Sequence, residues 1–182
     1  MARIRRITAR DETPEGQRHI FDAIVESRGR VVGPFQVLLN SPELAGRVAH
    51  LGAYVRFDST LSSPVRELAI ITTSRELDCE LEWSAHAPLA RQAGVSEQAI
   101  AAVGERGGLD SLNDDEAVII RYGRELTRDH RVTEPTYRAA RERFGERGVV
   151  ELTATMGYYA MLASVLNAFD IEPLEGGPRL PQ

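Results

Sequence analysis

The sequence contains no lysine, because all 22 of its basic residues are arginine, and it contains a single cysteine, Cys79. Schiff-base and pyridoxal enzymes need a lysine amine, and the P-loop needs its lysine on the nucleotide phosphates, so the sequence excludes both classes. One thiol cannot form an internal disulfide, a Cys-x-x-Cys redox pair or a multi-cysteine zinc site. Any disulfide would therefore join two molecules.

The chain also has little positive charge, with a net charge of −5 and a pI near 5.5 over 182 residues. A nucleic-acid-binding face normally shifts this balance toward basic residues, so we expect no nucleic-acid partner. The exception is a short basic arm, residues 1–13, which contains four arginines and which we expect to be solvated or packed on a partner subunit. No apolar stretch follows this arm, so we predict no secretory signal and, with a free thiol, a cytoplasmic protein.

A long uncharged stretch, residues 152–169, just reaches the length that a membrane-spanning helix requires. It contains seven polar residues or glycines, and its flanking acids, Glu151 and Asp170, are not accompanied by a basic cluster. We therefore predict no membrane span, and a helix buried in the core or in a subunit interface instead.

Helix starts recur along the chain, whereas the alternating pattern of strands is absent. Three segments have an N-cap residue followed by proline at the first helical position, and apolar residues recur at helical spacing between them. The sequence predicts an all-α, single-domain helical bundle over residues 14–172, followed by a flexible tail, residues 173–182, that is either loose or an arm on a neighbouring subunit. The expected helices are 14–28, 42–57, 64–76, 79–93, 96–104, 114–129, 134–144 and 147–169.

The residues best suited to chemistry cluster at the predicted fourth helix. Cys79, Glu82 and His86 stand at i, i+3 and i+7, so a thiol, a carboxylate and an imidazole share one helix face. Glu82 is four residues before His86, close enough to fix its tautomer. The helix start favours the Cys79 thiolate and the neighbouring acids oppose it, so the sequence leaves the direction of its pKa shift open.

Each of these residues also has a structural explanation. A buried free cysteine is usually a small hydrophobe, His86 could form a surface ion pair with Glu82, and Trp83 could belong to the core or an interface. Glu82 and His86 are two ligands, too few for a metal site without a third from elsewhere, so we predict no metal.

The spacing Glu67-x11-Cys79-x2-Glu82-x3-His86 resembles the carboxymuconolactone decarboxylase family, which includes alkylhydroperoxidase-like proteins. The resemblance extends over about residues 15–172 and includes the segments 40–44, 64–68, 89–96, 157–159 and 166–168. It implies an all-helical fold and a homo-oligomer, a dimer, a trimer or a ring of these, with active sites near the subunit contacts.

The resemblance also implies which residues carry the chemistry. The peroxidase branch has the pattern Glu-x11-Cys-x2-Cys-x3-His, in which the second cysteine attacks peroxide and the first resolves the disulfide. This chain has Glu82 in the position of the attacking cysteine, which removes the two-thiol cycle. A glutamate there, four residues before the histidine, is similar to the decarboxylase branch, whereas Cys79 and Glu67 are similar to the peroxidases.

These features give three hypotheses. The first is a cofactor-free enzyme that decarboxylates or isomerises a small carboxylated cyclic or aromatic-breakdown compound, with His86 as general acid and base, Glu82 and Glu67 as its partners, and a substrate-binding role for Arg66, Arg75 and Trp83. The second is a peroxidase that uses Cys79 together with an external thiol. The third is a binding or assembly protein without catalytic activity.

Overall fold

The computed structural model describes residues 2–173 and 176–181, and all regular secondary structure in these ranges is helical. The all-α prediction is therefore confirmed. Contacts within the chain gather in two compact units, residues 1–59 with 164–172 (unit 1) and residues 60–163 with 173–182 (unit 2). Unit 1 ends at residue 172 and unit 2 resumes at residue 173, where the sequence predicted the start of the tail.

Unit 1 contains α1 (Arg18–Arg28), α2 (Pro34–Leu38), α3 (Pro42–Ala53) and a π-helical turn, Tyr54–Asp58. Helix α1 packs against α3, and α2 also contacts α3. The sequence predicted α1 and α3, but not α2, which has only five residues and therefore too few for a visible helical period. Proline at the first position of both α2 and α3 supplies the fixed φ that favours helix initiation.

The basic arm is folded back onto unit 1. Its backbone donates from Arg3 N to Phe169 O (2.9 Å) and from Ile7 N to Gln36 O (2.8 Å), and the Ile7 side chain is buried. Arg10 forms an ion pair with Asp22 at 2.7 Å. The arm is thus held by its own chain, which differs from the expected solvated or partner-bound segment, because the sequence offered no way to see that Ile7 would find an apolar site.

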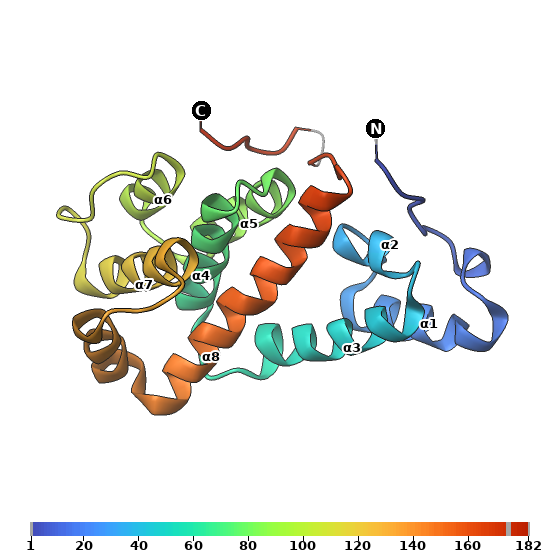
Figure 1. The fold of residues 1–182 in the computed structure, drawn as a ribbon, viewed down its shortest axis with the longest axis horizontal. Helices are drawn as coiled ribbons and strands as arrows, with labels where there is room; N and C mark the ends of the chain where they lie inside the picture. Colours follow the sequence, from blue (N-terminus) through green and yellow to red (C-terminus); the bar gives the residue numbers. More distant parts are fainter. Residues whose placement is uncertain (1, 174–175, 182) are drawn as a thin grey trace. The chain divides into compact units, whose positions relative to one another are not determined.

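Unit 2 is built around α4 (Ser63–Glu76), in which every residue from 67 to 75 is buried. Helix α4 lies between α5 (Glu80–Ala93) and α7 (Asp114–Arg124), as Figure 1 shows, and it also contacts α6 (Glu97–Gly104). A π-helical turn, Glu125–Asp129, extends α7. A helix covered on this many sides needs no polar face, and residues 68–74 of α4 are all apolar or small.

The last helix, α8 (Glu134–Ala168), is divided by Gly145, whose φ of 68° and ψ of 176° are non-helical and compatible mainly with glycine. The predicted division into 134–144 and 147–169 corresponds to this break. The helix is long and apolar enough to cross a membrane, but 56% of its most apolar window is buried inside the protein. That burial is typical of a core helix of a globular protein.

The predicted tail is partly ordered. Residues 174, 175 and 182 lie outside the described residues, but Leu180 is buried in the core of unit 2 and Arg179 lies 3.6 Å from Glu80. The apolar Leu180 side chain explains why this segment packs rather than remaining loose.

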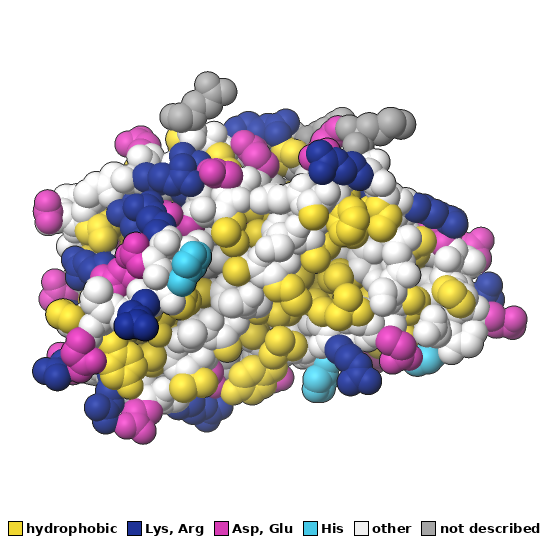
Figure 2. All heavy atoms as spheres, in the orientation of Figure 1, with side chains coloured by type: hydrophobic (Ala, Val, Ile, Leu, Met, Phe, Trp, Pro, Cys, Tyr) yellow, Lys and Arg dark blue, Asp and Glu magenta, His cyan; other side chains and the backbone are white. Residues whose placement is uncertain are grey.

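On the visible face of the molecule, acidic and basic side chains alternate without a large patch of one sign (Figure 2).

Candidate active site

The imidazole of His86 on α5 lies between two glutamates. Its Nδ1 is 2.7 Å from Oε2 of Glu67, and its Nε2 is 3.4 Å from Oε2 of Glu82. The three side chains are 5–8% exposed. The structure therefore brings together three of the predicted catalytic residues in a group that is almost completely shielded from water.

Two features of the sequence produce this arrangement. Glu67 stands on the buried helix α4, which packs along α5, and Glu82 and His86 are one turn apart on α5. Both glutamates were expected as partners of His86, and the shorter contact is the one with Glu67, on the other helix. Spacing along one helix could predict the contact with Glu82, whereas the contact with Glu67 depends on how α4 and α5 pack.

The donor and acceptor roles at His86 follow from its tautomer. With a proton on Nδ1 and Glu67 ionised, Nδ1–H donates to Oε2 of Glu67 over 2.7 Å. Nε2 then faces a second buried carboxylate, Glu82, at 3.4 Å. The imidazole thus has a carboxylate beside each of its ring nitrogens.

The ring of Tyr159, on α8, makes an edge-to-face contact with the ring of His86, with 5.1 Å between centroids. Tyr159 is itself buried and contacts Tyr158 in the same manner. We did not predict a role for Tyr159, although the segment 157–159 was part of the family resemblance. Its position fixes the plane of the imidazole, which is the orientation that proton transfer depends on.

Cys79 is the N-cap residue of α5 and its side chain is completely buried. Burial raises the pKa of the thiol to about 11, assisted by the negative charges of Glu82 and Glu80 and opposed by the backbone N–H groups of Glu82 and Leu81. The sequence left open whether the helix start or the acids would dominate. The structure shows that desolvation, which neither argument included, has the largest effect.

The remaining predicted residues are placed as follows. Arg75 is buried and donates to Gly104 O (2.7 Å), Asp78 Oδ1 (2.5 Å) and Pro181 O (3.1 Å). All of these acceptors belong to unit 2 and none is part of the His86 group.

Arg66 donates at the start of α4, to Leu61 O (3.3 Å) and to Ser63 Oγ (3.1 Å). Its Nε is buried and has no hydrogen-bond partner in the described residues. The ring of Trp83 lies in the core of unit 2, 3.2 Å from the position that a Cβ would take at Gly104. The structure brings none of Arg66, Arg75 and Trp83 into a hydrogen bond or ion pair with His86, judged on residues 2–173 and 176–181.

Comparison with known families gives a match at this site. Residues 42–110, which include Glu67, Cys79, Glu82 and His86, match the model of the carboxymuconolactone decarboxylase family. The segment that carries the site is therefore similar to this family. No curated protein matches the chain by sequence.

Solved structures share the fold of this protein over nearly the whole chain. An uncharacterized peroxidase-related protein from Silicibacter sp. TM1040 superposes with a TM-score of 0.75 at 19% identity, covering 96% of this chain and 92% of that one. An alkylhydroperoxidase AhpD core protein from Ralstonia eutropha JMP134, also described as peroxidase-related, gives 0.73 at 17% identity with 96% and 93% coverage. The debrominase Bmp8 gives 0.75 at 14% identity with 94% and 92% coverage. At these identities the likeness shows the fold alone.

Within the part of the chain that the structure describes, no three histidine, cysteine, aspartate or glutamate side chains are grouped so that they could hold a metal ion.

Proposed function

We propose that this protein is an enzyme that transfers protons to and from carbon without a cofactor, by decarboxylating or isomerising a small carboxylated cyclic compound. The observation that carries the proposal is the imidazole of His86 between the carboxylates of Glu67 and Glu82. A general acid and base needs a proton that it can release at a fixed position and recover, and this group supplies both requirements.

In a decarboxylation, the bond between the ring carbon and the carboxylate breaks, CO2 leaves, and the electron pair passes into a conjugated carbonyl. The resulting dienolate must accept a proton at carbon. His86 would deliver this proton from Nε2, the ring nitrogen that faces Glu82 rather than Glu67. Glu67 would stabilise the positive imidazolium before transfer, and its low-dielectric surroundings strengthen that interaction.

The test uses substitutions that remove the acid–base group of a side chain and keep a side chain of similar size. The purified protein would be incubated in D2O with a panel of unsaturated lactones that carry a carboxylate, and deuterium incorporated at carbon in the product would be measured by mass spectrometry. We expect turnover with deuterium incorporation, and a loss of about 10²-fold or more in His86→Gln, because general acid–base catalysis contributes on this scale. Glu82→Gln and Glu67→Gln should also lose activity.

The control is Glu142→Gln, which makes the same chemical change at an exposed glutamate of unit 2. It should retain the wild-type rate. Turnover that survives His86→Gln and Glu82→Gln unchanged would exclude this mechanism.

A thiol peroxidase is the second candidate function. It is favoured by the position of Cys79 at the start of α5 and by the similar solved structures that are described as peroxidase-related. Cys79 would attack the peroxide O–O bond, become a sulfenic acid and be reduced by an external thiol. Complete burial and a raised pKa oppose this function. Equal peroxide consumption by wild type and Cys79→Ser, with a small thiol present, would exclude it.

Binding without catalysis is the third possibility, and a thermal-shift screen against aromatic-acid breakdown products separates it from the first. A ligand that stabilises the protein and is turned over supports the enzyme, whereas stabilisation without turnover supports a binding protein.

The setting of the proposed enzyme is a cytoplasmic homo-oligomer that acts on a small molecule and has no nucleic-acid or membrane partner. Exposed apolar side chains follow one another along the end of α3 and the π-helical turn, at Leu51, Tyr54 and Phe57. Such a row supports a protein contact. Sedimentation equilibrium should therefore give a mass above 20.1 kDa, and a monomer at all concentrations would contradict the proposal.

A further inference from the structure

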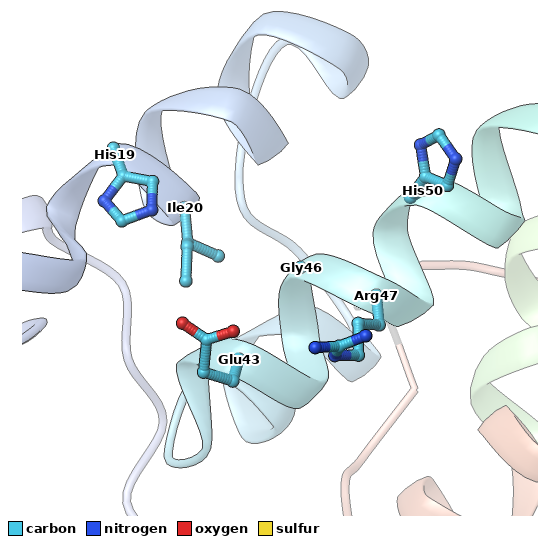
Figure 3. A pocket seen from close by; sticks show the side chains of 6 residues that line it. All are labelled: His19, Ile20, Glu43, Gly46, Arg47 and His50. Atoms are coloured by element: carbon cyan, nitrogen blue, oxygen red, sulfur yellow. The ribbon is translucent and has the colours of Figure 1, made fainter.

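Unit 1 contains an open groove between α1 and α3, with a volume of about 440 Å³. It is lined by His19, Ile20, Glu43, Gly46, Arg47 and His50, as Figure 3 shows. This volume falls in the range of small-molecule sites. None of these residues belongs to the His86 group, which lies entirely in unit 2.

The lining residues come together because four of them share one face of α3. Positions 43, 46, 47 and 50 are spaced by three, one and three residues, and His19 and Ile20 face them from α1. At Gly46, a Cβ would lie 3.3 Å from Cγ2 of Ile20. The absence of a side chain at position 46 therefore lets the two helices approach closely, and Ile20 and Gly46 together form the apolar part of the lining.

The polar side chains of the groove make few contacts. Among the described residues, no side-chain hydrogen bond or ion pair involves His19, Glu43, Arg47 or His50, and His19 acts on Asp22 only through its charge, which lowers the pKa of that carboxyl. The chain uses the same i, i+4 spacing of glutamate and arginine in Glu134 and Arg138, which pair at 2.6 Å. Glu43 and Arg47 have that spacing and that order, which favours pairing on a helix, and yet they remain apart.

We propose that this groove binds a small carboxylic acid that bears a hydroxyl or ammonium group next to its carboxylate and an apolar side chain. Arg47 offers a planar pair of donors that matches a carboxylate, and the imidazoles of His19 and His50 add ring N–H donors. Glu43 is the only acceptor among the charged lining residues, and it receives the hydroxyl or ammonium group. The apolar side chain of the ligand lies over Ile20 and Gly46.

This proposal goes beyond the decarboxylase function, because it assigns a second ligand to a unit of the protein that contributes no residue to the His86 group. It also identifies the ligand by three features at once, a carboxylate, a neighbouring donor and an apolar body. Inorganic phosphate shares only the negative charge of the carboxylate and has no apolar body, so it serves as the comparison ligand.

The experiment uses the full chain and three acids with the same isobutyl side chain, 2-hydroxy-4-methylpentanoate, leucine and 4-methylpentanoate, together with inorganic phosphate. Binding is followed by titration in ¹H–¹⁵N NMR spectra and by calorimetry. We expect saturable binding of the hydroxy acid or of leucine, with shifts centred on α1 and α3. The acid without the neighbouring donor should bind about tenfold more weakly or less, because it leaves Glu43 without a donor.

Two variants assign the contacts. Arg47→Met should weaken binding about tenfold or more, and Glu43→Gln should reduce the preference for the donor-bearing acids over 4-methylpentanoate. Arg30→Met is the matched control, since Arg30 is an exposed arginine of unit 1 that does not line the groove, and it should bind as wild type. Both lining positions are exposed, so unchanged melting temperatures are expected and would confirm that folding is intact.

The outcomes separate the possibilities. Tighter binding of the hydroxy acid would show that Glu43 accepts a hydrogen bond from a hydroxyl group, and tighter binding of leucine would show that it accepts one from an ammonium group. Either result supports the proposal. Absence of saturable binding by all three acids, equal losses in Arg47→Met and Arg30→Met, or binding of phosphate alone would each overturn it. The rate measurements on His86 variants are independent of all these results.

Discussion

Cys79 is expected to react slowly with thiol reagents in the folded protein, and this prediction bears directly on the choice between proton transfer and peroxidase chemistry. The perturbation is alkylation with iodoacetamide at pH 7, compared between native protein and protein unfolded in urea. Cys79 is the only cysteine in the chain, so every alkylated molecule reports on this site.

The magnitude follows from the pKa of about 11 against a reference value of 9.0. The thiolate fraction at pH 7 is then ~10⁻⁴ rather than ~10⁻². A more basic thiolate is the stronger nucleophile, which recovers about eightfold of this difference. Ionisation alone therefore slows the reaction about tenfold, and the fully buried side chain slows it further, because the reagent must wait for a local opening.

The assay is intact-protein mass spectrometry at timed intervals between pH 7 and pH 10. The native rate should rise about tenfold for each pH unit without levelling, because the whole range lies below the folded pKa. The unfolded protein should level off above its own lower pKa. The variant Cys79→Ser should show no adduct in either state.

Alkylation of native Cys79 at pH 7 as fast as in the unfolded chain would refute this reasoning. So would a native rate that levels off below pH 9, because that would place the folded pKa at or under the reference value. Either result would move the peroxidase from second to first candidate.

Two other predictions concern stability. The pKa of Cys79 is about 11 in the folded state against a reference value of 9.0, so the folded protein holds the thiol proton more tightly than the unfolded chain does. The resulting contribution to the free energy of unfolding is present below pH 9 and is lost as the pH rises through 11. Wild type should therefore lose up to about 3 kcal/mol more of its free energy of unfolding than Cys79→Ala over this range, measured by urea denaturation, and parallel curves would contradict the pKa shift. Gly123→Ala should cost about 1–3 kcal/mol, since its Cβ would lie 2.7 Å from Thr72 Cγ2 and 3.1 Å from Met156 Cε. Gly157→Ala, also within a helix but with nothing within 4 Å of the new Cβ, should instead gain about 0.5–1 kcal/mol, and equal effects at the two glycines would show that packing does not decide them.

Much of the helical architecture was predictable because its signals are local. Ser96 accepts a hydrogen bond from Ala99 N, and Asn113 accepts one from Glu116 N, so both residues cap helices whose starts, at 96 and 114, were predicted. The break at Gly145 lies between the two helices predicted at 134–144 and 147–169. In contrast, the short α2 has too few residues to show a period, and the burial of Ile7 and Leu180 depends on surfaces formed by distant parts of the chain.

The candidate site divides in the same manner. The neighbours Glu82 and His86 could be predicted because one helix turn places them together. The hydrogen bond from His86 to Glu67 and the ring contact with Tyr159 join separate helices, and only the packing of α5 with α4 and α8 determines them. The pKa of Cys79 could not be predicted because it depends mainly on burial, which a linear motif does not report.

The contacts of Arg75 give the absence of lysine a structural meaning. Its guanidinium reaches a carbonyl at the end of α6, a carboxylate before α5 and a carbonyl of the C-terminal segment, three acceptors in different directions. Arg124, on α7, similarly donates to Ala102 O within α6 and to Gly107 O just after α6. A lysine ammonium is a compact point charge and cannot span such acceptors as a planar guanidinium does. In a chain that cannot form an internal disulfide, these arginines tie helix ends and loops together, so replacing them by lysine would loosen the connections between helices while leaving the net charge unchanged.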